Sequence, residues 1–305
     1  MHRVQEASPC FSRARGALLG LAVGDAVGTT LEFEAPGTFE PIDDLVGGGP
    51  FALRPGQWTD DTSMALCLAE SLVECGGFDA GDQMERYLRW WREGHLSSTG
   101  HCFDIGGTVR GALGRYEASR EPFSGSEDPW SAGNGSIMRL APVPIFYAGD
   151  RSQAERYAAM SSRTTHGAAE CIDACRLLAH LLVRLMAGVS RGALFDEVDT
   201  LSLETPRIRA LARGEYRDKP REAIRGTGYV VDSLEASLWC FERAGDYREA
   251  VLMAANLGDD ADTTAAITGQ LAGARWGESG IPADWLKRLH DRELISDLAD
   301  RLIRK

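Results

Sequence analysis

Two acidic clusters, far apart in the chain, contain residue types suited to metal chemistry. They are Trp58-Thr59-Asp60-Asp61-Thr62 and Asn256-Leu257-Gly258-Asp259-Asp260-Ala261-Asp262-Thr263-Thr264. Neighbouring carboxylates repel one another unless positive charge lies among them. Carboxylate and hydroxyl oxygens are hard ligands of the kind that Mg²⁺, Mn²⁺ or Ca²⁺ prefer, and they do not make a typical zinc site. The clusters predict a divalent-cation site, and two cations sharing these carboxylates is the sharper hypothesis.

Each cluster precedes a run of small and apolar residues, so each is expected at the N-terminus of a buried helix. The helix dipole tolerates negative charge there. The alternative interpretation is that the acids only cap their helices. A calcium EF-hand is excluded, because the twelfth position counted from Asp259 or Asp260 is Gln270 or Leu271 and not a glutamate.

Apolar residues recur at helical spacing along most of the chain, and strand-like alternation is scarce. Gly16, Gly20, Gly24 and Gly28 would let the first helix pack closely against another. Helices are expected from Ser12 through Asp25 and over 59–73, 79–93, 153–160, 167–187, 191–201, 232–244, 247–255 and 285–304, with others through Val109, from Ile137 onward and after the second acidic cluster. The pattern predicts one all-α domain spanning residues 1–305, with residues 1–12 as a loose tail.

Four further segments hold candidate site residues. Glu32 lies between Leu31 and Phe33, and apolar neighbours can raise the pKa of a carboxyl group. Asp104, ahead of Gly106-Gly107, is either a helix cap or a functional carboxylate. The stretch Ala132-Gly133-Asn134-Gly135-Ser136 could bind a phosphate through backbone N–H groups, although a simple turn has the same composition. His166 is expected either to cap a helix or to face a ligand.

The composition narrows the class of protein. At 305 residues with 44% hydrophobic and 26% charged residues, the chain is a soluble globular protein. Its net charge of −12 argues against nucleic acid or an anionic membrane as the main partner. Seven scattered cysteines without a C-x-x-C pair indicate free thiols in a reducing compartment, and no apolar run is long enough to span a membrane. We expect a cytoplasmic monomer.

Five motifs, taken in order from about Arg15 to Gly277, resemble the ADP-ribosylglycohydrolase family, which includes the dinitrogenase reductase activating glycohydrolases and the ADP-ribosylarginine hydrolases. The motifs are residues 20–28 (GLAVGDAVG), 58–62 (WTDDT), 104–106 (DIG), 133–139 (GNGSIMR) and 258–264 (GDDADTT). The resemblance implies an all-helical enzyme that binds two Mg²⁺ or Mn²⁺ ions and releases ADP-ribose from modified proteins, with arginine-linked ADP-ribose as the expected substrate.

The resemblance also implies roles for individual residues. The cation ligands would be Thr59, Asp60, Asp61, Asp260, Asp262 and Thr263, whereas the orientation of Asp259 stays open. Glu32 would be a general base or acid, and Asp104 would hold the guanidinium leaving group. Substrate contacts would come from Gly133, Asn134, Gly135, Ser136, Met138, His166 and Tyr229, with the diphosphate on the glycine-containing turn and adenine stacked on Tyr229.

Other classes of protein remain as alternatives. The linkage could be that of ADP-ribosylserine or O-acetyl-ADP-ribose, or the chain could be a non-catalytic ADP-ribose-binding or structural member. A metal-dependent phosphohydrolase of the HD type has its dipeptide in His290-Asp291, but that pair lies on an amphipathic C-terminal segment and is interpreted as surface. The presence of all six implied ligands favours catalysis.

Overall fold

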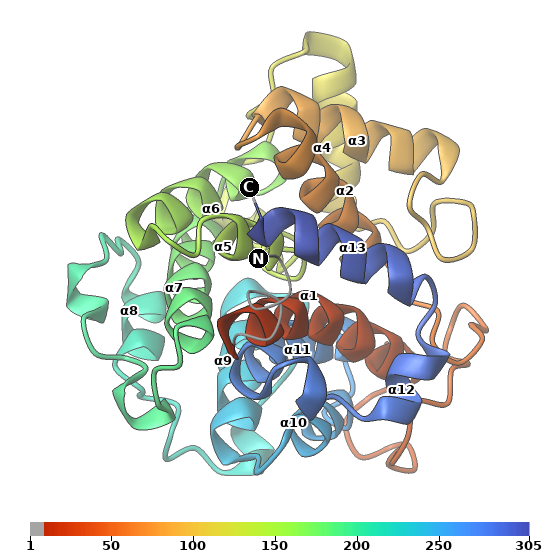
Figure 1. Cartoon of the computed structure of the whole chain (residues 1–305), viewed down its shortest axis with the longest axis vertical. Coiled ribbons are helices and arrows are strands. Elements are labelled where there is room, and N and C mark those ends of the chain that lie inside the picture. Colours follow the sequence, from red (N-terminus) through yellow and green to blue (C-terminus); the bar gives the residue numbers. More distant parts are fainter. Residues whose placement is uncertain (1–8, 305) are drawn as a thin grey trace, which may run out of the picture.

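Helices joined by loops make up the part of the chain that the structure describes, residues 9–304 of a computed structural model (Figure 1). The α-helices are α1 (Pro9–Gly28), α2 (Asp60–Cys75), α3 (Ala80–Glu93), α4 (Gly107–Ser119), α5 (Pro142–Phe146), α6 (Arg151–Thr165), α7 (Ala169–Met186), α8 (Pro206–Ala212), α9 (Val230–Arg243), α10 (Tyr247–Ala255), α11 (Ala261–Trp276), α12 (Ala283–Arg288) and α13 (Arg292–Ile303). The 3-10 turns are η1 (Thr29–Leu31), η2 (Pro129–Ser131), η3 (Arg191–Ala193), η4 (Val198–Thr200), η5 (Arg221–Ala223) and η6 (Glu278–Gly280). Over these residues the only β-type pairing is three isolated bridges, so the all-α prediction is confirmed.

Small residues bring α1 and α11 into close antiparallel contact at the centre of the molecule (Figure 1). A Cβ atom on Gly20 would lie 2.3 Å from the carbonyl oxygen of Gly269, and one on Gly24 would lie 2.2 Å from that of Ala265. Gly28 meets Ala261 in the same register. Because the helices are antiparallel, the end of α1 lies beside the start of α11. This pairing brings Glu32 to the second acidic cluster.

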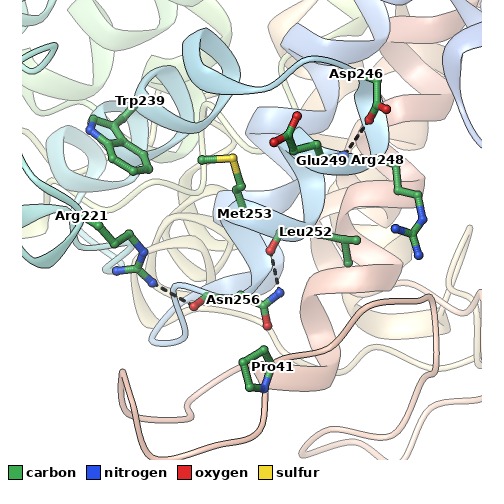
Figure 2. A pocket seen from close by; sticks show the side chains of 9 residues that line it. All are labelled: Pro41, Arg221, Trp239, Asp246, Arg248, Glu249, Leu252, Met253 and Asn256. Atoms are coloured by element: carbon green, nitrogen blue, oxygen red, sulfur yellow. Dashed lines mark hydrogen bonds between the residues drawn. The ribbon is translucent and has the colours of Figure 1, made fainter.

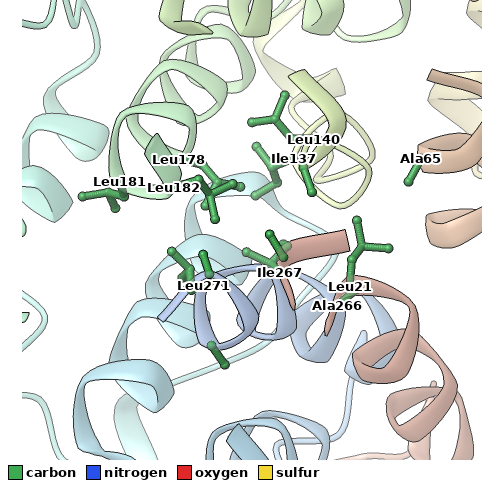
Figure 3. Packing of buried hydrophobic residues seen from close by; sticks show 14 of the residues in the cluster. Leu21, Ala65, Ile137, Leu140, Leu178, Leu181, Leu182, Ala266, Ile267 and Leu271 are labelled. Carbon is green, nitrogen blue, oxygen red and sulfur yellow. The ribbon is translucent and has the colours of Figure 1, made fainter. Parts of the chain in front are cut away.

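Apolar side chains from several helices enclose the α1–α11 pair. Leu21 of α1, Ile267 of α11 and Leu178 of α7 are fully buried and point into one core (Figure 3). A smaller cluster between α2, α3 and α4 contains Met64 and Tyr87. These two cores hold α2 and α11 rigidly, and the acidic clusters lie at the N-termini of these helices.

The first helix starts earlier than predicted. The predicted tail covers residues 1–12, of which residues 1–8 lie outside the described part, whereas Pro9 to Ser12 belong to α1. Proline is well tolerated in the first turn of a helix, where its missing N–H would have no partner in any case. Phe11 is buried, which ties this turn to the core.

The predicted helix from Ile137 onward is wrong. Residues 137–141 form turns, and α5 begins only at Pro142. Pro142 and Pro144 have no N–H group to donate to the preceding turn. The Gln270 side chain instead donates to the carbonyl oxygens of Ile137 and Met138, at 3.0 and 2.7 Å. A tertiary contact therefore replaces the helical bonds.

The predicted helix over 191–201 is also wrong, since this segment contains only the turns η3 and η4. Arg191 donates to the carbonyl oxygens of Phe241, Glu242 and Ala244 at the end of α9. Glu197 has a left-handed backbone, with φ of 67°. The segment is held by contacts with α9 that its own pattern does not show.

The C-terminal segment forms two helices instead of the one predicted over 285–304. The break lies at Leu289 to Asp291, and Asp291 has a φ of 51°. Gly56, from the long loop that precedes α2, lies against this break: a Cβ there would come within 1.9 Å of the Arg288 oxygen. The N–H of His290 donates to the Gly56 oxygen at 2.9 Å. The loop therefore replaces a turn of helix.

The cysteines and the helix lengths agree with the expectations from composition. All seven cysteines lie within the described residues and are free thiols. Among residues 9–304, no helix combines the length and the apolar character needed to cross a bilayer.

Candidate active site

The two acidic clusters meet where α2 and α11 begin. The Thr59 hydroxyl oxygen lies 3.2 Å from Asp262 Oδ2, and the Thr263 hydroxyl donates to Asp61 Oδ2 at 3.3 Å. These contacts join residues that are about two hundred positions apart in the sequence. The structure thus brings Thr59 and Asp61 of the first motif together with Asp262 and Thr263 of the second.

The capping alternative does not describe these residues. Thr59 and Asp260 occupy the N-cap positions of α2 and α11, but neither side chain makes a capping hydrogen bond. Elsewhere in the same protein, Asp79, Asp150 and Asp246 do cap their helices in the ordinary way. Thr59 and Asp260 therefore do not act as side-chain caps of α2 and α11.

The carboxylates form two groups that could each hold a metal ion. In each group the nearest carboxylate oxygens all lie within 4.8 Å of one another: Asp60, Asp61 and Asp262 form one group, and Glu32, Asp104 and Asp262 form the other. Asp61 Oδ1 and Glu32 Oε2 are buried and receive no hydrogen bond from the described residues. Buried carboxylate oxygens without donors fit a cation, because repulsion is otherwise uncompensated.

Burial and mutual repulsion perturb these groups strongly. Burial, followed by the charges of Asp104, Asp260 and Asp25, raises the pKa of Glu32 to about 10. Burial and the charges of Asp260 and Asp25 raise the pKa of Asp104 to about 7. Burial and neighbouring carboxylates also raise the pKa of Asp60, Asp61 and Asp262 well above the ordinary value. Such a cluster releases its protons readily only when cations compensate the charge.

Asp25 positions the start of α2, a role that sequence reasoning did not find. Its carboxylate accepts hydrogen bonds from the N–H groups of Thr59 and Thr62 at 2.9 and 3.0 Å, and from their hydroxyls at 3.0 and 2.6 Å. The side chain is completely buried in α1. Its place in the motif of residues 20–28 was the available signal.

Asp104 is not a helix cap. The helix α4 begins at Gly107 with Gly106 as its N-cap, and Asp104 lies before it with a left-handed φ of 58°. Its carboxylate belongs instead to the group with Glu32 and Asp262. The cap alternative for Asp104 is therefore wrong, and its role as a site residue stays a prediction.

The second cluster contains one carboxylate that turns outward. Asp259 forms a salt bridge with Arg225, with an N–O distance of 2.7 Å, and is in neither metal-capable group. Asp260 points inward and accepts a hydrogen bond from Asn134 Nδ2 at 2.8 Å. Asp260 lies outside the two tight groups in this structure, although its charge affects the pKa of Glu32 and Asp104.

The turn at residues 133–136 packs against a neutral histidine. His166 ends α6, and is not the N-terminal cap considered from the sequence. Burial, followed by the Arg139 guanidinium, lowers the pKa of His166 to about 3. A Cβ on Gly135 would lie 2.8 Å from the imidazole Cε1 atom, so glycine leaves room for this ring. The Arg139 side chain is buried and donates to the Gly135 oxygen at 3.0 Å, which anchors the turn.

The backbone of this turn is partly used within the protein. The N–H of Gly133 donates to Ser131 at 2.8 Å, and that of Asn134 donates to Gly228 at 3.1 Å. These two N–H groups are not directed at a ligand. Any phosphate contact from the predicted backbone set would therefore come from Gly135 and Ser136.

The site opens into a cavity of about 640 Å³. Its walls include Glu32, Phe33, Phe51, Asp60, Phe103, Asp104, Arg110, Asn134, Gly135, Met138, His166, Asp260, Asp262 and Thr263.

A second cavity of about 690 Å³ shares the wall residues Thr108, Gly133 and Gly228 and contains Tyr229. The Tyr229 hydroxyl donates to Glu170 and accepts from Arg207 at 2.8 Å. Trp130, which is 97% exposed, lines this second cavity and was missed in the sequence.

Another hollow, lined by α10 residues together with Pro41, Arg221 and Trp239, lacks this chemistry (Figure 2). Its polar groups are occupied locally: Arg221 donates to the Asn256 oxygen at 2.9 Å, and Asp246 caps the N–H of Glu249 at 2.8 Å. The chemistry-bearing residues of the described chain gather at the carboxylate cavity instead.

Comparison with known proteins agrees with this geometry. The sequence profile described as ADP-ribosylglycohydrolase matches residues 6–305. The chain belongs to the ADP-ribosylglycohydrolase family.

Three members of the ADP-ribosylglycohydrolase family are similar to this chain over most of its length. The ADP-ribosylarginine hydrolase Tri1 of Serratia proteamaculans (strain 568) is 46% identical over 295 residues, covering 97% of this chain and 80% of the relative. Its namesake from Pseudomonas putida (strain GB-1) is also 46% identical, covering 95% and 79%. The ADP-ribosyl dinitrogen reductase glycohydrolase of Rhodospirillum rubrum is 32% identical, covering 91% and 90%. This chain is a hydrolase of the ADP-ribosylglycohydrolase type.

A solved structure of the family has the same fold. A chain of an ADP-ribosylglycohydrolase-related protein complex superposes with a TM-score of 0.86 at 44% sequence identity, covering 97% of this chain and 98% of that one. The helical arrangement described above is therefore that of the ADP-ribosylglycohydrolases.

Proposed function

We propose that this protein removes ADP-ribose from arginine side chains of modified proteins, and that two divalent cations, Mg²⁺ or Mn²⁺, support the reaction. The observation that carries the proposal is the gathering of the Asp60, Asp61 and Asp262 carboxylates, with the Glu32 and Asp104 carboxylates beside Asp262. Support for the arginine linkage comes from two relatives at 46% identity that are named ADP-ribosylarginine hydrolases.

The proposed cation ligands are Thr59, Asp60, Asp61, Asp260, Asp262 and Thr263. Bound cations would supply Lewis-acid polarisation of a water and of the ribose hydroxyls. The chain holds the ligands in place through the Asp25 hydrogen bonds to Thr59 and Thr62. Asp104 and Glu32 lie close to Asp262, so both carboxylates are beside the proposed cations in the cavity.

Glu32 is the proposed proton carrier. The bond between the anomeric carbon and the arginine nitrogen breaks, and a water oxygen bonds to that carbon. Glu32 takes a proton from this water and returns it to the departing nitrogen, so that arginine leaves with its guanidinium intact. Glu32 is buried, with 4% of the residue's surface exposed, and it lines the cavity.

Asp104 is proposed to hold the leaving group. A guanidinium is planar and permanently charged, so one carboxylate can accept two parallel hydrogen bonds from it. A serine hydroxyl offers neither the charge nor the second donor. The left-handed backbone at Asp104 directs this side chain to Glu32 and not to the helix that follows.

The remaining predicted residues would hold the ADP-ribose. Gly135 lies against the buried, neutral His166, and Met138 lines the same cavity. Ser136 is buried in the same turn. A neutral imidazole would favour a diphosphate here through hydrogen bonds and not through charge. Asn134 holds Asp260. Adenine would lie in the adjoining cavity against Tyr229, where Trp130 offers a second aromatic face.

The decisive experiment compares linkages. Purified protein is incubated with arginine-linked and serine-linked ADP-ribosyl proteins and with O-acetyl-ADP-ribose, with and without EDTA. We expect release from arginine only, abolished by EDTA and restored by Mg²⁺ or Mn²⁺. Faster cleavage of another linkage would refute the arginine assignment, and binding of ADP-ribose without any release would indicate a non-catalytic member. The phosphohydrolase alternative has no support in the site, because the metal-capable groups of the described residues contain no histidine.

A further inference from the structure

Three phenylalanines line the cavity that contains the carboxylates. Phe33, Phe51 and Phe103 all line it, and Phe33 is 68% exposed, although it is a large apolar residue. Phe51 and Phe103 are half-buried and contact each other edge to face, with ring centroids 5.1 Å apart. Phe33 follows Glu32, and Phe103 precedes Asp104. The three rings therefore share one cavity with the two carboxylates that are not on α2 or α11.

The backbone is strained at each point that presents one of these rings. Phe33 has a φ of 64°, Ala52 after Phe51 has 50°, and Asp104 after Phe103 has 58°. Left-handed backbone is uncommon for residues with a side chain and persists only where the surroundings impose it. Four of the eight such residues in the described chain are these three and Asp259.

Local hydrogen bonds hold the strained segments. The Phe33 N–H donates to the Asp259 oxygen at 2.7 Å, and the Asp259 N–H donates to the Glu34 oxygen at 2.8 Å. The Phe51 turn is closed by the paired bonds between Gly48 and Leu53, at 2.8 and 2.9 Å. An exposed aromatic side chain on a clamped, strained backbone is pre-organised for contact with something outside the chain.

We propose that Phe33, Phe51 and Phe103 form an aromatic collar that binds the arginine side chain of the modified protein. This role rests on the proposed function and adds the residues that would contact the arginine leaving group. Guanidinium groups stack on aromatic faces, and the methylenes of arginine pack on the same rings. Glu32 and Asp104, the two carboxylates of the cavity wall that are not proposed cation ligands, suit a cationic occupant beside the rings.

The other aromatic pair belongs to the opposite part of the substrate. Trp130 and Tyr229 line the adjoining cavity beyond Gly133 and Gly228, away from the Glu32 and Asp104 carboxylates. A substrate with adenine against Tyr229 and its anomeric carbon at Glu32 leaves the collar for the arginine. Trp130 therefore serves as a matched aromatic control for the collar.

The test separates the two ends of the substrate. For Phe33→Ala, Phe51→Ala and Trp130→Ala, one measures kcat/KM on an arginine-ADP-ribosylated protein and the inhibition constant of free ADP-ribose. We expect the two collar variants to lower kcat/KM about tenfold, the size of one cation–aromatic contact, while the inhibition constant stays within about twofold. Trp130→Ala should weaken inhibition by free ADP-ribose and lower kcat/KM by a similar factor. Phe33→Tyr, which keeps the aromatic face, should restore most of the loss. Phe51 is not adjacent in sequence to a site carboxylate, so its variant separates collar contact from disturbance of Glu32.

Several results would overturn the collar. These are unchanged kcat/KM in both collar variants, or an equal loss of ADP-ribose affinity, which would assign the rings to the ADP-ribose portion. Failure of the proposed function is distinct, because the unaltered protein would then not cleave the arginine linkage at all.

Discussion

At the scale of single residues, the site depends on carboxylates whose neighbours leave them few alternatives to a cation. Asp262 belongs to both metal-capable groups, whereas Asp259, three positions earlier, faces Arg225. Asp25 is satisfied by four donors from Thr59 and Thr62 and has the different role of orienting α2. Aspartates of the same or neighbouring motifs therefore have different surroundings.

Replacing Asp262 by Asn should remove most cation binding and nearly all activity, because the amide has no negative charge and would contact both proposed cations. Asp259→Asn is the matched control and should retain both properties. Titration calorimetry with Mg²⁺ or Mn²⁺ measures binding, and release of ADP-ribose measures activity. Equal cation affinity in Asp262→Asn and the unaltered protein would exclude this ligand assignment.

Replacing Asp104 by Asn tests the proposed hydrogen bonds between its carboxylate and the guanidinium leaving group. We expect kcat/KM for ADP-ribosylarginine to fall by roughly a hundredfold, since charged hydrogen bonds contribute about 1.5–3 kcal/mol. Binding of free ADP-ribose, which lacks the guanidinium, should change much less. A parallel loss of both quantities would show that Asp104 shapes the ADP-ribose site and does not act on the leaving group.

At the scale of elements, the antiparallel contact between α1 and α11 fixes the geometry of the site. Gly16, Gly20 and Gly24 each meet backbone carbonyls of α11, and no side chain fits between them. The same register brings the end of α1, and with it Glu32, to the start of α11. A change in this contact should therefore affect both stability and catalysis.

Gly24→Ala should destabilise the fold by about 1–3 kcal/mol, because the new methyl group would lie 2.2 Å from the Ala265 oxygen and the helices must separate. Gly114→Ala in α4 is the matched control, since a Cβ there meets nothing within 4 Å. This second change should be neutral or stabilise by up to about 1 kcal/mol through helix propensity. Denaturant unfolding of both variants gives the comparison, and an equal effect would show that the close approach is not needed.

At the scale of the whole molecule, the carboxylate cluster opposes folding unless cations are bound. A cation that binds only the native state stabilises it by about 2.7 kcal/mol at a hundredfold excess over Kd. Without cations, the raised pKa of Asp25 (about 6) and of Asp104 (about 7) means that the folded protein retains protons that the unfolded chain releases. The resulting decrease in the free energy of unfolding is absent below about pH 4 and grows as the pH rises towards 7.

Melting temperatures in EDTA and in millimolar Mg²⁺ should therefore diverge as the pH rises from about 4 to 7, with the Mg²⁺ form more stable. His166 has a lowered pKa, so its contribution runs the other way and stabilises the fold as pH increases. It lies outside the two metal-capable groups, and its effect should be common to both conditions. A gap between the curves that stays constant over this range would contradict the carboxylate origin of the effect.

Much of this protein is determined by local sequence. Helical spacing of apolar residues predicted the all-α class, and the small residues of the first helix predicted a close helix contact, because both features depend on neighbours within a few turns. Carboxylates and threonines at two helix starts predicted the hard-ligand chemistry, since residue type alone sets what such a site can bind. The family resemblance pointed to Glu32 and Asp104, which the structure brings together.

Only the tertiary structure decided the rest, because the deciding contacts come from distant segments. Gly56 against Arg288 splits the C-terminal helix, and Gln270 satisfies carbonyls where a helix from Ile137 was expected. The pairing of Asp259 with Arg225 turns that carboxylate away from the site. Asp104 lies beside Glu32 only because its own helix starts later, at Gly107, and the backbone before it is left-handed. The spacing of apolar residues in the sequence does not predict such contacts, because each depends on where the folded chain places a residue from another element.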